Sequence, residues 1–189
     1  MKFPHFRPVQ RGMTMMEVLV SIVVLTFGLL GIAALMVVGI KSSYSSQQRS
    51  QATQLAYDMM DRVRSNNAGT NAGSYNQPAT STTATAYTTA QASCVGATGT
   101  ATGCSTALMA QEDLYEWELS IKAALGSTAF GIVCLDSSGA SGSLSGTTIT
   151  PACDGLGATY AVKVYWQDDR GQTQTATPQV QAFVTRFLP

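Results

Sequence analysis

An apolar run close to the N-terminus places the strongest constraint on this chain of 189 residues. Residues 18–40 read VLVSIVVLTFGLLGIAALMVVGI and contain no charged side chain. A helix of this length spans about 34 Å, which is enough to cross a hydrocarbon core of roughly 30 Å. Residues 1–12 carry three basic side chains and no acidic one, so we expect a single-pass protein whose N-terminus is cytoplasmic.

The border between the basic segment and the apolar run carries the candidate processing site. A secretory signal peptide has a shorter apolar region with a small-x-small cleavage site after it, so here we expect the cut before the run, between Gly12 and Met13. Glu17 is an acidic residue at the threshold of the run, where a carboxylate is costly unless it is paired or solvated. The plainer interpretations are a glutamate that faces interfacial water and a generic single-span anchor.

Gly12, the following residues MTMME and the apolar helix together resemble the class III signal of type IV prepilins. The resemblance implies that a prepilin peptidase cuts after Gly12 and methylates the new amine of Met13, and that Glu17 is the assembly residue. The amine, with an ordinary pKa of about 7.7–8.0, can approach Glu17 of a neighbouring subunit. In an apolar surround, such a pair costs less free energy than either charge alone. Major pilins usually begin with Phe, so Met13 favours a minor pilin or a pseudopilin.

The helical pattern continues beyond the apolar run. Residues 41–64 contain no Pro and no Gly, and their apolar side chains recur at spacings of three and four residues. We therefore expect one helix over about residues 14–64, which the SNNAG segment at 65–69 would end. Its first part, 13–40, is apolar all round, and its second part is amphipathic and should pack on a soluble domain. The positions expected to pack are Tyr44, Ala52, Leu55, Ala56, Met59, Met60 and Val63.

The remainder of the chain divides by composition into two regions. Residues 65–110 are rich in Thr, Ser, Ala and Gly and are expected to form surface loop, with a short strand at best near Tyr87; a binding role for this loop is an alternative. Within 111–189, residues 111–125 share an apolar face and predict a short second helix. Glu112 and Asp113 suit the N-terminal end of that helix, and Gly126 suits its C-terminal cap.

Three strand-like runs follow the second helix. Residues 130–135 are apolar, residues 160–166 alternate with Lys163 on the face opposite to Trp166, and residues 180–187 alternate more loosely after Pro178, which is expected to start the last strand. These runs predict an antiparallel sheet of three or four strands. The expected fold is α+β and pilin-like: one long helix, half transmembrane and half amphipathic, packed on a small antiparallel sheet with a short second helix.

Two weaker patterns in the C-terminal region resemble the PilV group of minor pilins, the type IV pilus modification proteins. The first is Asp113, Trp117 and Leu125 followed by a strand that bears a glycine, and the second is a late strand with Trp166 and Asp168 before a glycine turn. The same architecture occurs in minor pseudopilins of the I class in type II secretion.

The four cysteines all follow the apolar run, on the side that is periplasmic or extracellular, where disulfides persist. Four cysteines allow three connectivities. The spacings favour two local loops, Cys94–Cys104 and Cys134–Cys153. No CxxC pair is present, so neither redox catalysis nor a thiolate zinc site is expected.

Composition argues against catalysis and nucleic-acid binding. The single histidine, His5, lies in the segment expected to be removed, which excludes Ser-His-Asp, Cys-His and histidine-ligated metal chemistry from the mature chain. Removing Lys2, Arg7 and Arg11 leaves eight basic residues against eleven acidic ones, a formal side-chain charge of −3 that does not suit DNA. Four acidic residues are interpreted as a solvated helix face rather than as catalytic carboxylates: Glu112, Asp113, Glu116 and Glu118. We expect no enzyme activity, cofactor or metal.

The resemblance implies a minor pilin that primes assembly of type IV pili and lies near the filament tip, with cell adhesion and twitching motility as the activities of such filaments. Its implied partners are prepilin peptidase, other minor pilins, the major pilin and a PilY-type tip adhesin. The precursor would lie in the inner membrane, with its soluble part periplasmic, and would then enter the pilus at the cell surface. Two alternatives stay open. One is a minor pseudopilin of type II secretion, and the other is a membrane-anchored periplasmic binding module that keeps residues 1–12.

Overall fold

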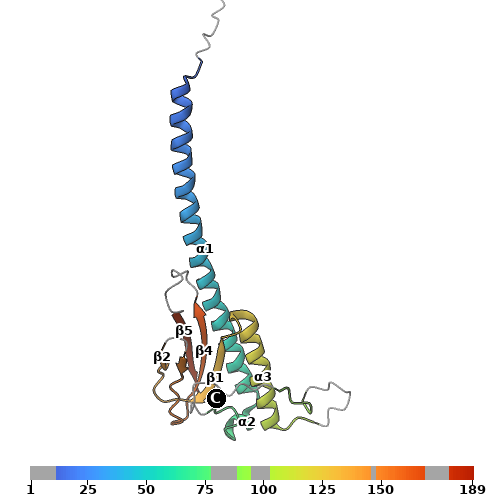
Figure 1. The fold of residues 1–189 in the computed structure, drawn as a ribbon. Coiled ribbons are helices and arrows are strands. Elements are labelled where there is room, and N and C mark those ends of the chain that lie inside the picture. The colour runs from blue at the N-terminus through green and yellow to red at the C-terminus, as the bar shows by residue number, and fades with distance from the viewer. Residues whose placement is uncertain (1–11, 78–88, 95–102, 146–147, 169–178) are drawn as a thin grey trace, which may run out of the picture. The chain divides into compact units, whose positions relative to one another are not determined.

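The computed structural model describes residues 12–77, 89–94, 103–145, 148–168 and 179–189. The chain forms two compact units, the first ending at Ser42 and the second beginning at Ser43. The helices are α1 (Met15–Ser65), α2 (Asn67–Asn71) and α3 (Thr106–Leu125), and the strands are β1 (Phe130–Leu135), β2 (Ser143–Ser145), β3 (Thr148–Thr150), β4 (Tyr160–Asp168) and β5 (Gln179–Phe187) (Figure 1). The expected α+β fold, a long N-terminal helix packed on a small antiparallel sheet with shorter helices, is confirmed.

The first unit contains the apolar part of α1. Every residue over 12–44 is exposed, and the helix is long and apolar enough to cross a membrane. Two hydroxyl groups lie inside the apolar run, and each donates to a carbonyl of its own helix: Ser21 to Glu17 at 2.7 Å and Thr26 to Val23 at 2.8 Å. The helix therefore satisfies these polar groups by itself, as a segment in lipid must.

The part of α1 that belongs to the second unit buries one face. Ala52, Ala56, Met59 and Val63 are fully buried, which confirms the amphipathic pattern at those positions. The expectation for Tyr44 is wrong, because its side chain is 57% exposed. The buried face of α1 begins one turn later, at Gln48.

The sheet has the strand order β1-β4-β5, with both neighbouring pairs antiparallel. Val133 of β1 lies opposite Val162 of β4, and Val162 lies opposite Thr185 of β5. One face of β4 packs into the main core together with α1 and α3, and it carries the side chains that the alternation predicted: Tyr160, Val162, Val164 and Trp166. Figure 1 shows α3 beside the second-unit part of α1.

A separate two-stranded hairpin, β2 and β3, covers part of the opposite face of the sheet. Its Ile149 packs against Ile132, Tyr165 and Val180, which project from that face. The sequence did not predict this hairpin, because residues 136–150 are rich in Ser, Gly and Thr and show no apolar alternation. Each face of the three-stranded sheet is therefore covered over at least part of its area.

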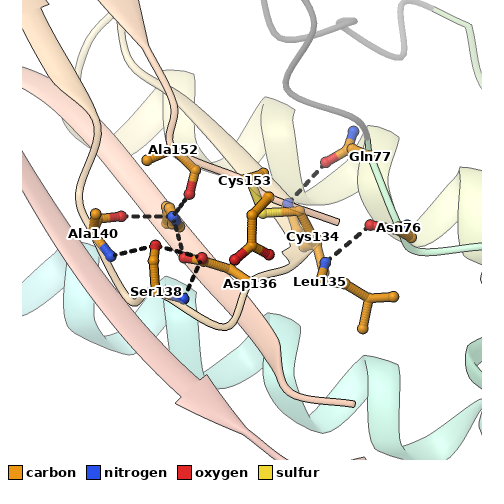
Figure 2. The surroundings of a disulfide bond; sticks show 12 residues. Asn76, Gln77, Cys134, Leu135, Asp136, Ser138, Ala140, Ala152 and Cys153 are labelled. Carbon is orange, nitrogen blue, oxygen red and sulfur yellow. Dashed lines mark hydrogen bonds and ion pairs between the residues drawn. A yellow bond between two sulfur atoms is a disulfide. The ribbon is translucent and has the colours of Figure 1, made fainter. Parts of the chain in front are cut away.

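The outer edge of β1 is closed by the chain itself. Gln77 donates its backbone N–H to the carbonyl of Val133, and its side-chain oxygen accepts from the N–H of Val133, both at 2.9 Å. The Asn76 side chain accepts from the N–H of Leu135 at 2.9 Å (Figure 2). These contacts satisfy an edge that would otherwise be a template for pairing.

The helix boundaries differ from the sequence prediction in two places. The short helix α2 follows α1 directly, and the Asn66 side chain caps it by accepting from the N–H of Gly69 at 3.2 Å. Helix α3 begins at Thr106, five residues before the expected start, because Ser105 caps it. Glu112 therefore lies beyond the first turn, and the expectation that it and its neighbour complement the helix N-terminus is wrong.

Gly126 ends α3 as the sequence predicted. Its N–H donates to the carbonyl of Lys122 at 3.1 Å, and its φ of 107° is one that glycine adopts without strain. The expected strand near Tyr87 and the expected strand start at Pro178 lie outside the described residues.

Candidate functional site

The candidate processing bond lies just before α1. Gly12 and Met13 precede the helix, and the Met13 side chain is 72% exposed. No described atom outside the adjoining residues lies within 4 Å of the position that a Cβ on Gly12 would take. The bond between Gly12 and Met13 is thus outside the helical hydrogen-bond ladder and accessible among the described residues, which is a state that a peptidase requires.

Thr14 fixes where α1 begins. The sequence placed the helix start near this residue, but its capping role was missed. Its hydroxyl oxygen accepts from the N–H of Glu17 at 3.3 Å, and its carbonyl lies 3.1 Å from the same nitrogen. Thr three residues before Glu, directly ahead of an apolar run, is the capping-box pattern and was readable in the sequence. The cap excludes Met13 from the helix and places Glu17 at the third helical position.

Glu17 is therefore a carboxylate in the first turn of a long helix, close to the positive end of the helix dipole. No residue in the described part of the chain forms a hydrogen bond or an ion pair with this carboxylate. The apolar surface from residue 18 to residue 40 that follows it is exposed throughout. An exposed apolar surface of this size is characteristic of a contact with lipid or with other helices.

Arg62 connects α1 to α3 in the second unit. Its guanidinium group contacts Asp58 at 3.0 Å on its own helix, and Glu116 at 2.9 Å and Asp113 at 3.4 Å on α3. Burial alone would lower the pKa of Arg62, but the three carboxylates outweigh burial and raise it. Arg62 therefore remains charged and ties the two helices together.

Tyr75 completes this contact from the segment after α2. Its hydroxyl donates to the second oxygen of Asp113 at 2.5 Å, and the amide nitrogen of Asn66 donates to that hydroxyl at 3.2 Å. The same amide nitrogen donates to the carbonyl of Thr106 at 2.7 Å. Burial and then the bond to Asp113 raise the pKa of Tyr75, so the phenol remains a donor.

The sequence placed four acidic residues of α3 on a solvated face: Glu112, Asp113, Glu116 and Glu118. This expectation is wrong for Glu112 and Glu118, which are only 8% and 7% exposed. Glu112 accepts from the backbone N–H of Gln91, and Glu118 pairs with Lys122 at 2.7 Å. Since these carboxylates bind to the chain itself, they act as structural anchors. The described residues contain no group of three or more His, Cys, Asp or Glu that could hold a metal ion.

Two disulfides lie in the second unit. Cys94 is bonded to Cys104, with their Cα atoms 4.7 Å apart, and Cys134 is bonded to Cys153, with their Cα atoms 6.0 Å apart. Cys134 is buried in β1, and Cys153 lies in the segment between β3 and β4 (Figure 2).

A buried ion pair beside the second disulfide was missed by sequence reasoning. The ammonium group of Lys163 in β4 lies 2.6 Å from a carboxylate oxygen of Asp136, and neither side chain is exposed. Lys163 also donates to the carbonyls of Ala140, at 2.6 Å, and Ala152, so three acceptors surround its three N–H groups. Figure 2 shows the three residues that supply these acceptors, Asp136, Ala140 and Ala152.

The other oxygen of Asp136 is satisfied locally. It accepts from the N–H and the hydroxyl of Ser138, at 2.9 and 2.7 Å. Burial alone would raise the pKa of Asp136, but the bonds from Lys163 and Ser138 outweigh burial and hold the pKa below its ordinary value. The only signal for this pair in the sequence was a lysine inside an apolar strand. That signal indicates a buried lysine only when β4 is known to be the central strand of the sheet.

One comparison with known protein families gives a match. A family described as Tt1218-like, type IV pilin Tt1218, matches residues 34–115, from the apolar part of α1 into α3. The matched range does not include Gly12, Met13 or Glu17. No curated protein and no solved structure matches the chain significantly. Together with the long membrane-compatible helix, the small sheet and the paired cysteines, the match supports a pilin role for this chain.

Proposed function

We propose that this chain is a minor pilin of the PilV group that primes type IV pilus assembly and is incorporated near the tip. The observation that carries the proposal is the exposed apolar part of α1 with Glu17 in its first turn. Prepilin peptidase cuts between Gly12 and Met13 and methylates the amine of Met13. Before assembly the subunit is held in the inner membrane, with its second unit periplasmic.

Assembly transfers the apolar helix surface from lipid to the helices of other pilins. Lipid chains are as apolar as the helix, so the transfer depends on close van der Waals packing and on polar pairs more than on the hydrophobic effect. Glu17 supplies the polar pair. Its carboxylate meets the methylated amine of a neighbouring subunit and fixes the axial register of the two helices.

Each segment of the chain has its own proposed role. The leader is 1–12, the filament core is 13–40, the amphipathic part is 41–64, the loop region is 65–110, and the helix-plus-sheet region is 111–189. The second unit, rigidified by the contacts of Arg62 and by two disulfides, presents surfaces to other minor pilins, the major pilin and a PilY-type adhesin.

A minor pseudopilin of type II secretion is the second candidate, favoured by the same N-terminal features and by Met13 in place of Phe. The two candidates differ in phenotype. The test is an in-frame deletion of the gene in the native host, with surface filaments counted by electron microscopy and secreted proteins analysed from the same culture.

Loss of filaments with normal secretion would support the pilus, and normal filaments with lost secretion would move the chain to the pseudopilus. Complementation with the wild-type gene controls for polar effects. The intact mass of protein purified from membranes provides a separate test: a chain that retains residues 1–12 would contradict both candidates and support an anchored binding module.

A further inference from the structure

The segment around Cys153 is attached to the end of β1 on both sides of the sulfur. Ala152 precedes Cys153 and accepts from the ammonium group of Lys163, which also binds Asp136. Asp136 lies two residues after Cys134, the partner of Cys153. One buried cation therefore connects the chain beside one cysteine to the chain beside the other.

The attachment on the other side uses Asp154. Its carboxylate accepts from the N–H of Ser137 at 3.1 Å and from the Ser137 hydroxyl at 2.5 Å. The next residue, Gly155, donates its N–H to the carbonyl of Leu135 at 3.0 Å. These contacts do not involve sulfur, so nothing in them requires the disulfide to be closed.

We propose that Lys163 and Asp154 are positioning residues for oxidation and select Cys134 as the partner of Cys153. They hold residues 152–155 against residues 135–137, so the two thiols meet in the reduced chain. Cys94 and Cys104 are thereby left to pair with each other, and one of three connectivities is favoured. This inference is independent of the role in a filament.

The chemistry is ordinary thiol–disulfide exchange. The thiols of Cys134 and Cys153 lose two protons and two electrons, the S–S bond forms, and a disulfide oxidant is reduced to two thiols. Neither positioning residue exchanges a proton or an electron in this step. Their contribution is to raise the effective concentration of one thiol at the other.

Thermodynamic linkage separates a positioning role from a merely structural one. A residue that stabilises the oxidised and the reduced folded states equally leaves the oxidation equilibrium unchanged. A residue that holds the two thiols together shifts this equilibrium. The discriminating quantity is thus the glutathione ratio at which half of the Cys134–Cys153 pair is oxidised in the folded chain.

The experiment uses the full chain in detergent micelles, equilibrated with reduced and oxidised glutathione. Free thiols are alkylated, and each pair is quantified by peptide mass mapping, with circular dichroism verifying the fold. The variants are Asp154→Ala and Lys163→Met. The controls are Asp61→Ala, another exposed aspartate, and Tyr165→Phe, which removes the hydrogen bond to the Ser141 carbonyl but leaves every bond of Lys163 and Asp154 in place.

We expect Asp154→Ala to lower the effective thiol concentration about fivefold, because Ser137 loses the acceptor of its N–H and hydroxyl groups. Lys163→Met should lower it about tenfold or more and yield species in which Cys153 is joined to Cys94 or Cys104. Both controls should stay within twofold of the wild type. If both variants reach half-oxidation of the Cys134–Cys153 pair at the same glutathione ratio as the wild type, the proposal is overturned. If Lys163→Met does not fold, the result for Asp154→Ala decides alone.

Discussion

The indole of Trp117 lies directly on Gly131. A Cβ at Gly131 would be 2.3 Å from Cη2 and 2.4 Å from Cζ3 of the indole, distances that real Cβ contacts do not show. The same indole donates its Nε1–H to the carbonyl of Leu55 in α1 at 2.8 Å. Trp117 of α3 therefore contacts the sheet with its ring edge and α1 with its nitrogen. Gly131 of β1 has no side chain and leaves the space that the ring occupies.

Gly131→Ala should lower the free energy of unfolding by about 1–3 kcal/mol, because the new methyl group overpacks the Trp117 ring. The measurement is urea unfolding of the full chain in detergent, followed by circular dichroism. Trp117→Phe lacks the ring atoms that clash, so combining the two substitutions should cost less than the sum of the single costs. Strictly additive costs would contradict the contact.

Tyr75→Phe should lower the free energy of unfolding by about 1–3 kcal/mol, because Asp113 loses a donor inside the fold. Tyr57→Phe is the matched control, since Tyr57 is 48% exposed and should change stability by no more than about 0.5 kcal/mol. Both variants keep the ring. Equal stabilities for the two would show that the Tyr75 hydroxyl contributes nothing.

Acid should weaken the second unit through Asp136. The folded pKa of Asp136 lies below the unfolded value of about 3.9, so its contribution is present above that pH and is lost as the pH falls through the folded pKa. The free energy of unfolding, measured between pH 7 and pH 2, should fall below about pH 4. The double variant Asp136→Leu with Lys163→Met should lose part of this decline, and an unchanged decline would contradict the assignment.

The fold was predictable where a periodic pattern had one interpretation. The uncharged run at 18–40, the spacing of Ala52, Ala56 and Met59, and the alternation of β4 each gave the correct element. The hairpin β2–β3 was not predictable, because polar side chains of the sheet hold the preceding loop: Tyr165, for example, donates to the carbonyl of Ser141 at 2.6 Å. Contacts of this kind leave no apolar period in the sequence.

The residues proposed for processing and assembly stay a prediction from the sequence, whose local geometry the structure adds. Gly12, Met13 and Glu17 were proposed from a family pattern. The capping role of Thr14 between them was missed, although its spacing from Glu17 was visible. The Asp136–Lys163 pair was missed for a different reason. A pair of residues 27 positions apart is joined only when the register of β1 and β4 brings them together.

Gly12→Ala should slow or block processing, because it introduces a side chain at the proposed cleavage bond. The measurement is an immunoblot of membrane fractions for precursor and mature forms, with the mass of each verified. Gly39→Ala is the matched control, since it also places a methyl group at a position with no described neighbour within 4 Å. Mature protein at wild-type levels in the Gly12→Ala strain would refute the cleavage site.

Glu17→Val should be processed normally but incorporated poorly. The substitution leaves Gly12, Met13 and the Thr14 hydroxyl in place, so the peptidase meets the same bond and the helix keeps its start. It removes the carboxylate that, in the proposed assembly, pairs with the amine of a neighbouring subunit. An unpaired charge in an apolar surround is costly, so the helix would lose its register. The measurement is the ratio of this subunit in sheared filaments to that in membranes, where we expect about a tenfold loss, or about 1.4 kcal/mol.

Asp61→Asn, which removes an exposed carboxylate from the same helix, should leave the ratio unchanged. Normal incorporation of Glu17→Val would refute the register mechanism while leaving the cleavage site intact.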